Sequence, residues 1–167
     1  IEYYNKVARL PRDGFSPDAE FPVIYAEKGI LQVRFHFEFD RAPFLYLQGG
    51  EAPNMVCSRC EALPRSVQAS RAEKCGLKTK GKKLIAYGKS AHGSTPELGE
   101  NAILPILRYF ERDSVIKYII DSLFNDQYGL TELKDDTGRL TMSPNMIKFR
   151  KSQLQVVTDF RYPASFS

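Results

Sequence analysis

The sequence has few cysteines and histidines and no tryptophan: its 167 residues include three cysteines and two histidines. An odd number of cysteines in a chain of this length argues against a disulfide framework and for a reducing compartment, so we expect a cytoplasmic protein. Long hydrophobic runs are also missing. No uncharged apolar stretch approaches the roughly 20 residues that a bilayer-spanning helix needs, and we therefore expect no membrane partner.

The sequence also lacks a large excess of either charge: 24 Lys and Arg stand against 20 Asp and Glu, which leaves a net charge of +4. This mild excess steers no specific partner by itself. Its main concentration lies in residues 78–83, with Arg71 and Lys74 upstream. The segment lacks the interleaved aromatic side chains on which nucleic-acid bases stack. We interpret it as a solvated hairpin or helix end and expect no nucleic-acid partner.

What is present is the composition of a folded globular domain, with 43% hydrophobic, 12% aromatic and 26% charged residues. Strict alternation predicts a half-exposed strand over residues 30–40, with phenylalanines on one face. Further strands are expected over residues 21–25, 43–48, 84–88, 147–150 and 154–161. Helices are expected over residues 1–10, 66–75, 94–110 with a kink at Pro105, and from 113 or 114 to near 125. The mixed order predicts an α/β (α+β) fold, a two-layer sandwich with a largely antiparallel sheet.

One of the two histidines, His92, is a candidate for a functional role. His92 stands among small residues between a predicted strand and a predicted helix start, at which Ser94 and Glu97 could form a capping box. Backbone N–H groups and the positive end of a helix dipole favour an oxyanion or carboxylate there. The alternative is a loop histidine with an incidental hydrogen bond. His36 belongs to the polar row of the strand over residues 30–40, and a solvated position is expected for it.

Other chemically capable residues carry weaker signals. Cys57 and Cys60 have the spacing of redox and zinc sites, but no second such pair and no paired histidine accompanies them. We interpret them as two ordinary thiols. Asp18 precedes an apolar segment and could bind a metal or cap a turn. Arg161 follows Asp159 by two residues, and it could form a surface ion pair or grip a carboxylate as a fork.

Four stretches together resemble one family. They are residues 14–29, which contain Asp18; residues 49–56, which contain Gly49-Gly50 and Asn54; residues 90–102, Ser-Ala-His-Gly-Ser-Thr-Pro-Glu-Leu-Gly-Glu-Asn-Ala; and residues 158–163, Thr-Asp-Phe-Arg-Tyr-Pro. The chain resembles the M20 zinc metallopeptidases, and most closely the dipeptidases of the PepV and carnosinase-like branch. In that family the motif that continues after Asn54 has a proline where Cys57 stands.

The resemblance implies a role for each matching residue. Asp18 corresponds to a zinc ligand, Asn54 to a substrate contact, and Arg161 to the arginine that binds the substrate carboxylate. His92 corresponds to the histidine that reaches over the metals and donates to the oxyanion. The resembled enzymes carry two zinc ions that share a water. We expect no zinc on this chain alone, because the family's other metal ligands and its general base, part of a Glu-Glu pair, are absent from the sequence.

The resemblance also implies a domain organisation. Residues 1–27 would be a remnant of the catalytic domain, 28–163 a ferredoxin-like lid or dimerisation domain with helices on one face of its sheet, and 164–167 the return to the catalytic domain. The chain, which begins at Ile1, would then be part of a longer enzyme and inactive by itself. Its expected partners are a short peptide substrate, the rest of its catalytic domain and a homodimer mate. The alternatives are an M20 N-acyl amino acid deacylase or desuccinylase, or a non-catalytic dimerisation module.

Overall fold

The computed structural model describes residues 26–166. The expectations for the helix over residues 1–10, the strand over residues 21–25 and the metal-ligating role of Asp18 therefore lie outside the described residues. The same holds for nearly all of the expected catalytic remnant, residues 1–27.

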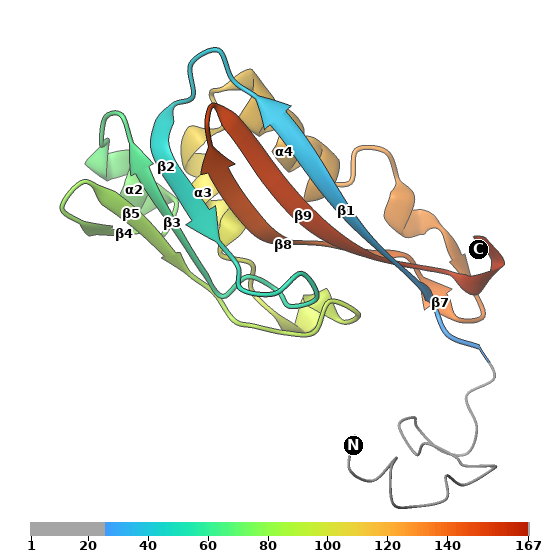
Figure 1. Cartoon of the computed structure of the whole chain (residues 1–167). Coiled ribbons are helices and arrows are strands. Elements are labelled where there is room, and N and C mark those ends of the chain that lie inside the picture. The colour runs from blue at the N-terminus through green and yellow to red at the C-terminus, as the bar shows by residue number, and fades with distance from the viewer. Residues whose placement is uncertain (1–25, 167) are drawn as a thin grey trace, which may run out of the picture.

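The described part is built on a seven-stranded sheet in the order β1-β9-β8-β2-β3-β5-β4, in which every neighbouring pair is antiparallel (Figure 1). The strands are β1 (Gly29–Glu38), β2 (Phe44–Gly49), β3 (Arg59–Pro64), β4 (Lys78–Lys80), β5 (Lys83–Tyr87), β8 (Thr141–Arg150) and β9 (Gln153–Tyr162). A separate hairpin joins β6 (Lys134–Asp135) to β7 (Gly138–Arg139). The largely antiparallel sheet is confirmed.

Three α-helices lie on one side of this sheet: α2 (Ala69–Lys74), α3 (Ile103–Phe110) and α4 (Ser114–Leu123) (Figure 1). Short 3-10 turns cover Pro96–Leu98 (η1), Leu130–Glu132 (η2) and Ala164–Phe166 (η3). The core fills the space between sheet and helices, and its fully buried side chains include Leu47, Leu84, Ile106, Ile119 and Leu154. The predicted two-layer α+β sandwich with helices on one face is thus confirmed. Among the helices of residues 26–166, none is long and apolar enough to cross a bilayer.

Most of the predicted strands are present, and two are longer than expected. The alternation of β1 is confirmed: Phe35 and Phe37 pack against the core while the intervening residues are exposed. The hairpin of β8 and β9 turns through Lys151 and Ser152, whose φ angles of 48° and 64° suit a two-residue connection between twisted strands. β3 was not predicted, because its six residues include no β-branched or aromatic side chain and end in Pro64.

The helix expected over residues 94–110 is confirmed only in its second part, α3, and the expected start at Ser94 is wrong. Only η1 forms there, its N-cap is Thr95, and no side-chain cap is made. The backbone of Glu100 instead exchanges hydrogen bonds of 2.8 and 2.9 Å with Lys89, which holds the segment in a two-residue bridge. The α-helix begins only at Ile103, so Pro105 falls in its first turn. The backbone N–H groups of a helix's first turn have no intrahelical acceptor, so the N–H that Pro105 lacks costs no hydrogen bond of the helix. The kink expected at Pro105 therefore has no cause.

α4 begins at Ser114, one of the two expected starts, and Asp113 is its N-cap: Asp113 Oδ1 accepts from Val115 N at 3.0 Å and Ile116 N at 3.1 Å. We expect Asp113→Ala to lower the free energy of unfolding by about 1 kcal/mol, because two N–H groups lose their acceptor. Urea denaturation measures this. Asp113→Asn keeps the oxygen and is the matched control; equal loss in both variants would contradict capping as the cause.

Candidate functional site

Two loops meet at one end of the sheet, the segment that follows β2 and the segment between β5 and α3 (Figure 1). Gly93 N donates to the carbonyl of Asn54 at 2.7 Å, and Val56 N donates to the carbonyl of Ala91 at 2.9 Å. Between these bonds Met55 and His92 form an antiparallel bridge. The structure therefore brings Asn54 and His92 together from positions 38 residues apart in the sequence.

Gly93 is the point where the loops touch the sheet. A Cβ at Gly93 would lie 2.4 Å from Oδ2 of Asp159 and 3.1 Å from the carbonyl oxygen of Asn54. No side chain fits in that space, so the glycine permits the close approach of the loop to β9. Asp159 in turn accepts a hydrogen bond from Arg161 Nε at 3.0 Å. A continuous chain of contacts thus joins Asn54 to the His92 loop, to β9 and to Arg161. We call this group the two-loop site: Asn54, His92, Gly93, Asp159 and Arg161.

Asp159 and Arg161 form a buried ion pair, not the surface pair that was one of the expected alternatives. Their side chains are 0% and 12% exposed, respectively. Both lie on the sheet face opposite the helices, since Phe160 between them packs toward the core side against Phe35. Asp159 Oδ1 has no hydrogen-bond partner among the described residues. The pair is therefore held in a poorly solvated place, where charge interactions are strong.

A second contact fixes the loop that carries Asn54. Asn145 of β8 is fully buried, and its Nδ2 donates to the carbonyl of Pro53 at 2.8 Å. Its Oδ1 accepts from Ser143 Oγ at 2.6 Å. The neighbouring Gly50 has a φ of +81°, and a Cβ there would lie 1.9 Å from the carbonyl oxygen of Asn145. Asn54 is thus positioned from the sheet as well as from the His92 loop.

His92 is exposed, and its hydrogen bonds define which ring nitrogen is free. Ser94 N approaches His92 Nδ1 at 3.3 Å, and Ser94 Oγ lies 2.7 Å from the same atom. A backbone amide can only donate, so Nδ1 is an acceptor. In the neutral ring the proton therefore lies on Nε2, which leaves the Nε2–H group to donate to a ligand.

The other candidate residues are not part of this site. His36 lies at the exposed edge of the sheet, with Nδ1 2.9 Å from Gln153 Oε1, as its place in the polar row predicted. Cys57 and Cys60 are free and buried, and burial raises the pKa of Cys57 to about 11 and that of Cys60 well above its ordinary value. Such thiols are protonated near neutral pH and unreactive, which supports their interpretation as ordinary buried side chains.

The described residues do not fit a zinc site, because residues 26–166 contain no group of three or more His, Cys, Asp and Glu that could hold a metal ion. Asp18, the one expected ligand, lies outside that range. We therefore assign no step of chemistry on these residues to a metal. What the two-loop site offers is a hydrogen-bond donor at His92, an amide at Asn54 and a guanidinium at Arg161.

Three residues that build the site were not among the predicted site residues: Gly93, Asn145 and Asp159, which was expected only as the partner in a possible surface ion pair. A signal existed for Asp159, since alternation along β9 places residues 159 and 161 on the same face. Nothing in the sequence indicated that a loop would cover that face. Gly93 and Asn145 gave no signal, because their roles depend on contacts with segments far away in the sequence, Asn54 and Asp159 for Gly93 and Pro53 for Asn145.

Comparisons with known proteins find dipeptidases. The chain is 26% identical to the Bacillus subtilis (strain 168) protein named "Putative dipeptidase YtjP", and the match covers 99% of this chain and 42% of that protein. It is 24% identical to the Beta-Ala-Xaa dipeptidase of Lactobacillus delbrueckii subsp. lactis, over 98% of this chain and 41% of that enzyme. No family model matches the chain. The chain spans less than half the length of these relatives, and it is similar to one part of a dipeptidase sequence.

Proposed function

We propose that the chain is the lid and substrate-binding part, with residues 28–163 as the lid domain, of a zinc-dependent dipeptidase of the M20 type that hydrolyses short peptides. The observation that carries the proposal is the two-loop site: Asn54, His92 and Arg161 come from three separate segments and are joined through Gly93 and Asp159. The similarity of almost the whole chain to dipeptidases supports it. The zinc ions would be bound outside residues 26–166.

In this proposal Arg161 binds the carboxylate end of the peptide. Its Nε is bonded to Asp159, which fixes the plane of the guanidinium and leaves the terminal N–H groups for a ligand carboxylate. Asn54 holds the same end of the peptide, and together the two residues select substrates by length.

His92 would act on the scissile bond. Its Nε2–H donates to the carbonyl oxygen as negative charge develops on it, while Ser94 holds Nδ1 and so the orientation of the ring. His92 itself is exposed on the described chain, which suits a surface that closes onto a catalytic domain.

The proposal also includes the location of the protein in the cell and its binding partners. The three free cysteines support a cytoplasmic location, and a second copy of the chain is a proposed partner beside the catalytic domain and the peptide.

Kinetics on the complete enzyme test this function. We expect dipeptides to have a kcat/KM at least roughly tenfold above that of N-acyl amino acids of equal length, because the relatives that the chain resembles are named dipeptidases. Peptidase assays of the 167-residue chain with added zinc are the control, and we expect no cleavage. A preference for N-acyl amino acids would assign the protein to the deacylases, and cleavage by the chain alone would overturn its role as a lid.

A further inference from the structure

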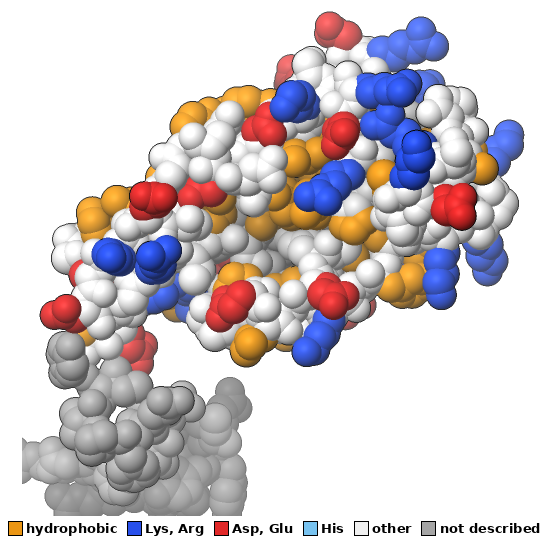
Figure 2. All heavy atoms as spheres, turned by 180° about the vertical axis from the view of Figure 1, so that it is seen from behind, with side chains coloured by type: hydrophobic (Ala, Val, Ile, Leu, Met, Phe, Trp, Pro, Cys, Tyr) orange, Lys and Arg blue, Asp and Glu red, His pale blue; other side chains and the backbone are white. Residues whose placement is uncertain are grey.

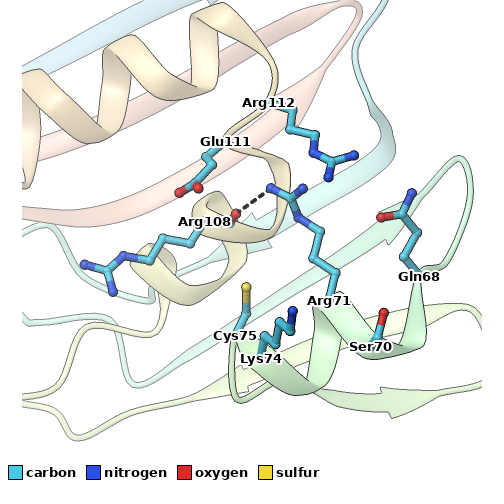
Figure 3. A pocket seen from close by; sticks show the side chains of 8 residues that line it. All are labelled: Gln68, Ser70, Arg71, Lys74, Cys75, Arg108, Glu111 and Arg112. Carbon is cyan, nitrogen blue, oxygen red and sulfur yellow. Dashed lines mark hydrogen bonds between the residues drawn. The ribbon is translucent and has the colours of Figure 1, made fainter.

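A second site lies on the helix side of the molecule, between α2 and the end of α3. Figure 2 views that side and shows Lys and Arg side chains gathered toward one end of it. There a cavity of about 470 Å³ is lined by Gln68, Ser70, Arg71, Lys74, Cys75, Arg108, Glu111 and Arg112 (Figure 3). A volume of this size accommodates a small molecule.

The lining carries an excess of positive charge. Four of the lining side chains are cationic and one, Glu111, is anionic, which leaves three net positive charges. The ion pairs of residues 26–166 involve Arg59 and Lys83 with Glu61, Lys117 with Asp121, and Arg161 with Asp159. None of them includes a cation of the cavity. Cations without an ion-pair partner that face a common concave space attract an anion strongly, because their fields add there.

Arg71 is the best-placed of these cations. Its Nη2 donates to the carbonyl of Arg108 at 3.2 Å, and its guanidinium lies 5.9 Å from the centre of the Tyr109 ring. Its Nε is buried and lacks a hydrogen-bond partner among the described residues. In Figure 3 the guanidinium groups of Arg71 and Arg112 and the amine of Lys74 border the space between the two helices. An anion there would offset the cost of holding Arg71 in place.

We propose that this cavity binds a small solute that carries at least two negative charges on phosphate-type oxygens, such as a pyrophosphate or a phosphate ester. The volume of the cavity suits a small solute, and its charge favours a polyanion over a monocarboxylate. Gln68 and Ser70 supply neutral hydrogen-bonding groups beside the cations. The inference is independent of the proposed dipeptidase function, since none of these residues belongs to the two-loop site.

Isothermal titration calorimetry of the chain with pyrophosphate, inorganic phosphate and acetate tests the proposal. We expect binding in the order pyrophosphate, phosphate, acetate, and a Kd for pyrophosphate at least roughly tenfold weaker in Lys74→Gln/Arg112→Gln, since two charge-assisted contacts are lost. Both residues are exposed, so the fold should tolerate the change. Arg34→Gln/Lys134→Gln removes the same charge from exposed positions on β1 and β6 and should bind as the unmodified chain does.

Three other results would overturn the inference. If pyrophosphate does not bind, the proposed site is excluded. Equal weakening in the two double variants would show attraction by the overall charge and not by the cavity. Binding of a single-stranded oligonucleotide without binding of pyrophosphate would assign the cations to a polymer surface.

Discussion

Replacing His92 by alanine should lower the kcat of the proposed complete dipeptidase by about 100- to 1000-fold, the usual cost of removing one donor to a developing oxyanion. The structure gives the reason: Ser94 occupies Nδ1, so the proton of the neutral ring is on Nε2 and available as that donor. Stability should change little, because His92 is exposed. Steady-state kinetics on a dipeptide substrate measure the effect.

The chain supplies a matched control for this experiment. His36 is the other histidine, it is exposed on β1, and its ring bonds only to side chains at the edge of the sheet. His36→Ala should leave kcat unchanged. If the complete enzyme binds zinc as proposed, the zinc content of the His92→Ala variant should stay near normal, since no ligand cluster is found around His92 in residues 26–166. Unchanged turnover in His92→Ala would remove this residue from the mechanism.

Ser94→Ala extends the test to orientation. It removes the hydroxyl that lies 2.7 Å from Nδ1 and keeps the weaker backbone contact. The expected loss of kcat is therefore smaller than that of His92→Ala, and a change in KM is not expected, because in the proposed mechanism the ring would contact the substrate mainly in the transition state.

Strands with regular alternation were predictable from the sequence, and segments fixed by distant partners were not. The pattern of residues 30–40 identified β1, since the partly buried Val33, Phe35 and Phe37 alternate with exposed residues. The segment after Ser94 carries all the local signals of a helix start, and a long-range bridge between Lys89 and Glu100 overrides them. Helix propensity is a weak preference that such tertiary contacts outweigh.

The candidate site was predictable to a similar degree. The resemblance indicated Asn54, His92 and Arg161 one by one, each from its own motif. These three residues lie together in space because Gly93 has no Cβ and because Asp159 is buried. Both are properties of the packed structure. A buried carboxylate and an exposed one look alike in a sequence, which explains why a surface ion pair stayed among the alternatives.

The burial of that ion pair leads to a prediction about stability. Arg161→Met should lower the free energy of unfolding by about 3–5 kcal/mol, because it leaves the carboxylate of Asp159 buried without its charge partner. The side chain of Asp159 is 0% exposed and its Oδ1 already lacks a partner among the described residues, so little solvent can compensate. Urea denaturation of the chain measures the loss.

A double variant tests whether the lost stability comes from the unpaired charge of Asp159. Asp159→Asn/Arg161→Met removes both charges and should recover much of the lost stability, since replacing a whole buried pair is often close to neutral. Lys117→Met is the matched control: it breaks the exposed pair with Asp121, whose side chains are 66% and 29% exposed, and should change stability little. Equal small losses in Arg161→Met and Lys117→Met would contradict the burial of Asp159.

The same double variant distinguishes the structural role of Arg161 from its proposed role in binding. If Arg161 served only to neutralise Asp159, the enzyme that carries Asp159→Asn/Arg161→Met would regain its KM along with its stability. If the guanidinium binds the peptide carboxylate, stability returns while KM for dipeptides stays raised at least roughly tenfold, because no cation remains to hold that end of the substrate. We expect the second result, since Nε alone faces Asp159 and the terminal N–H groups of Arg161 are left for a ligand.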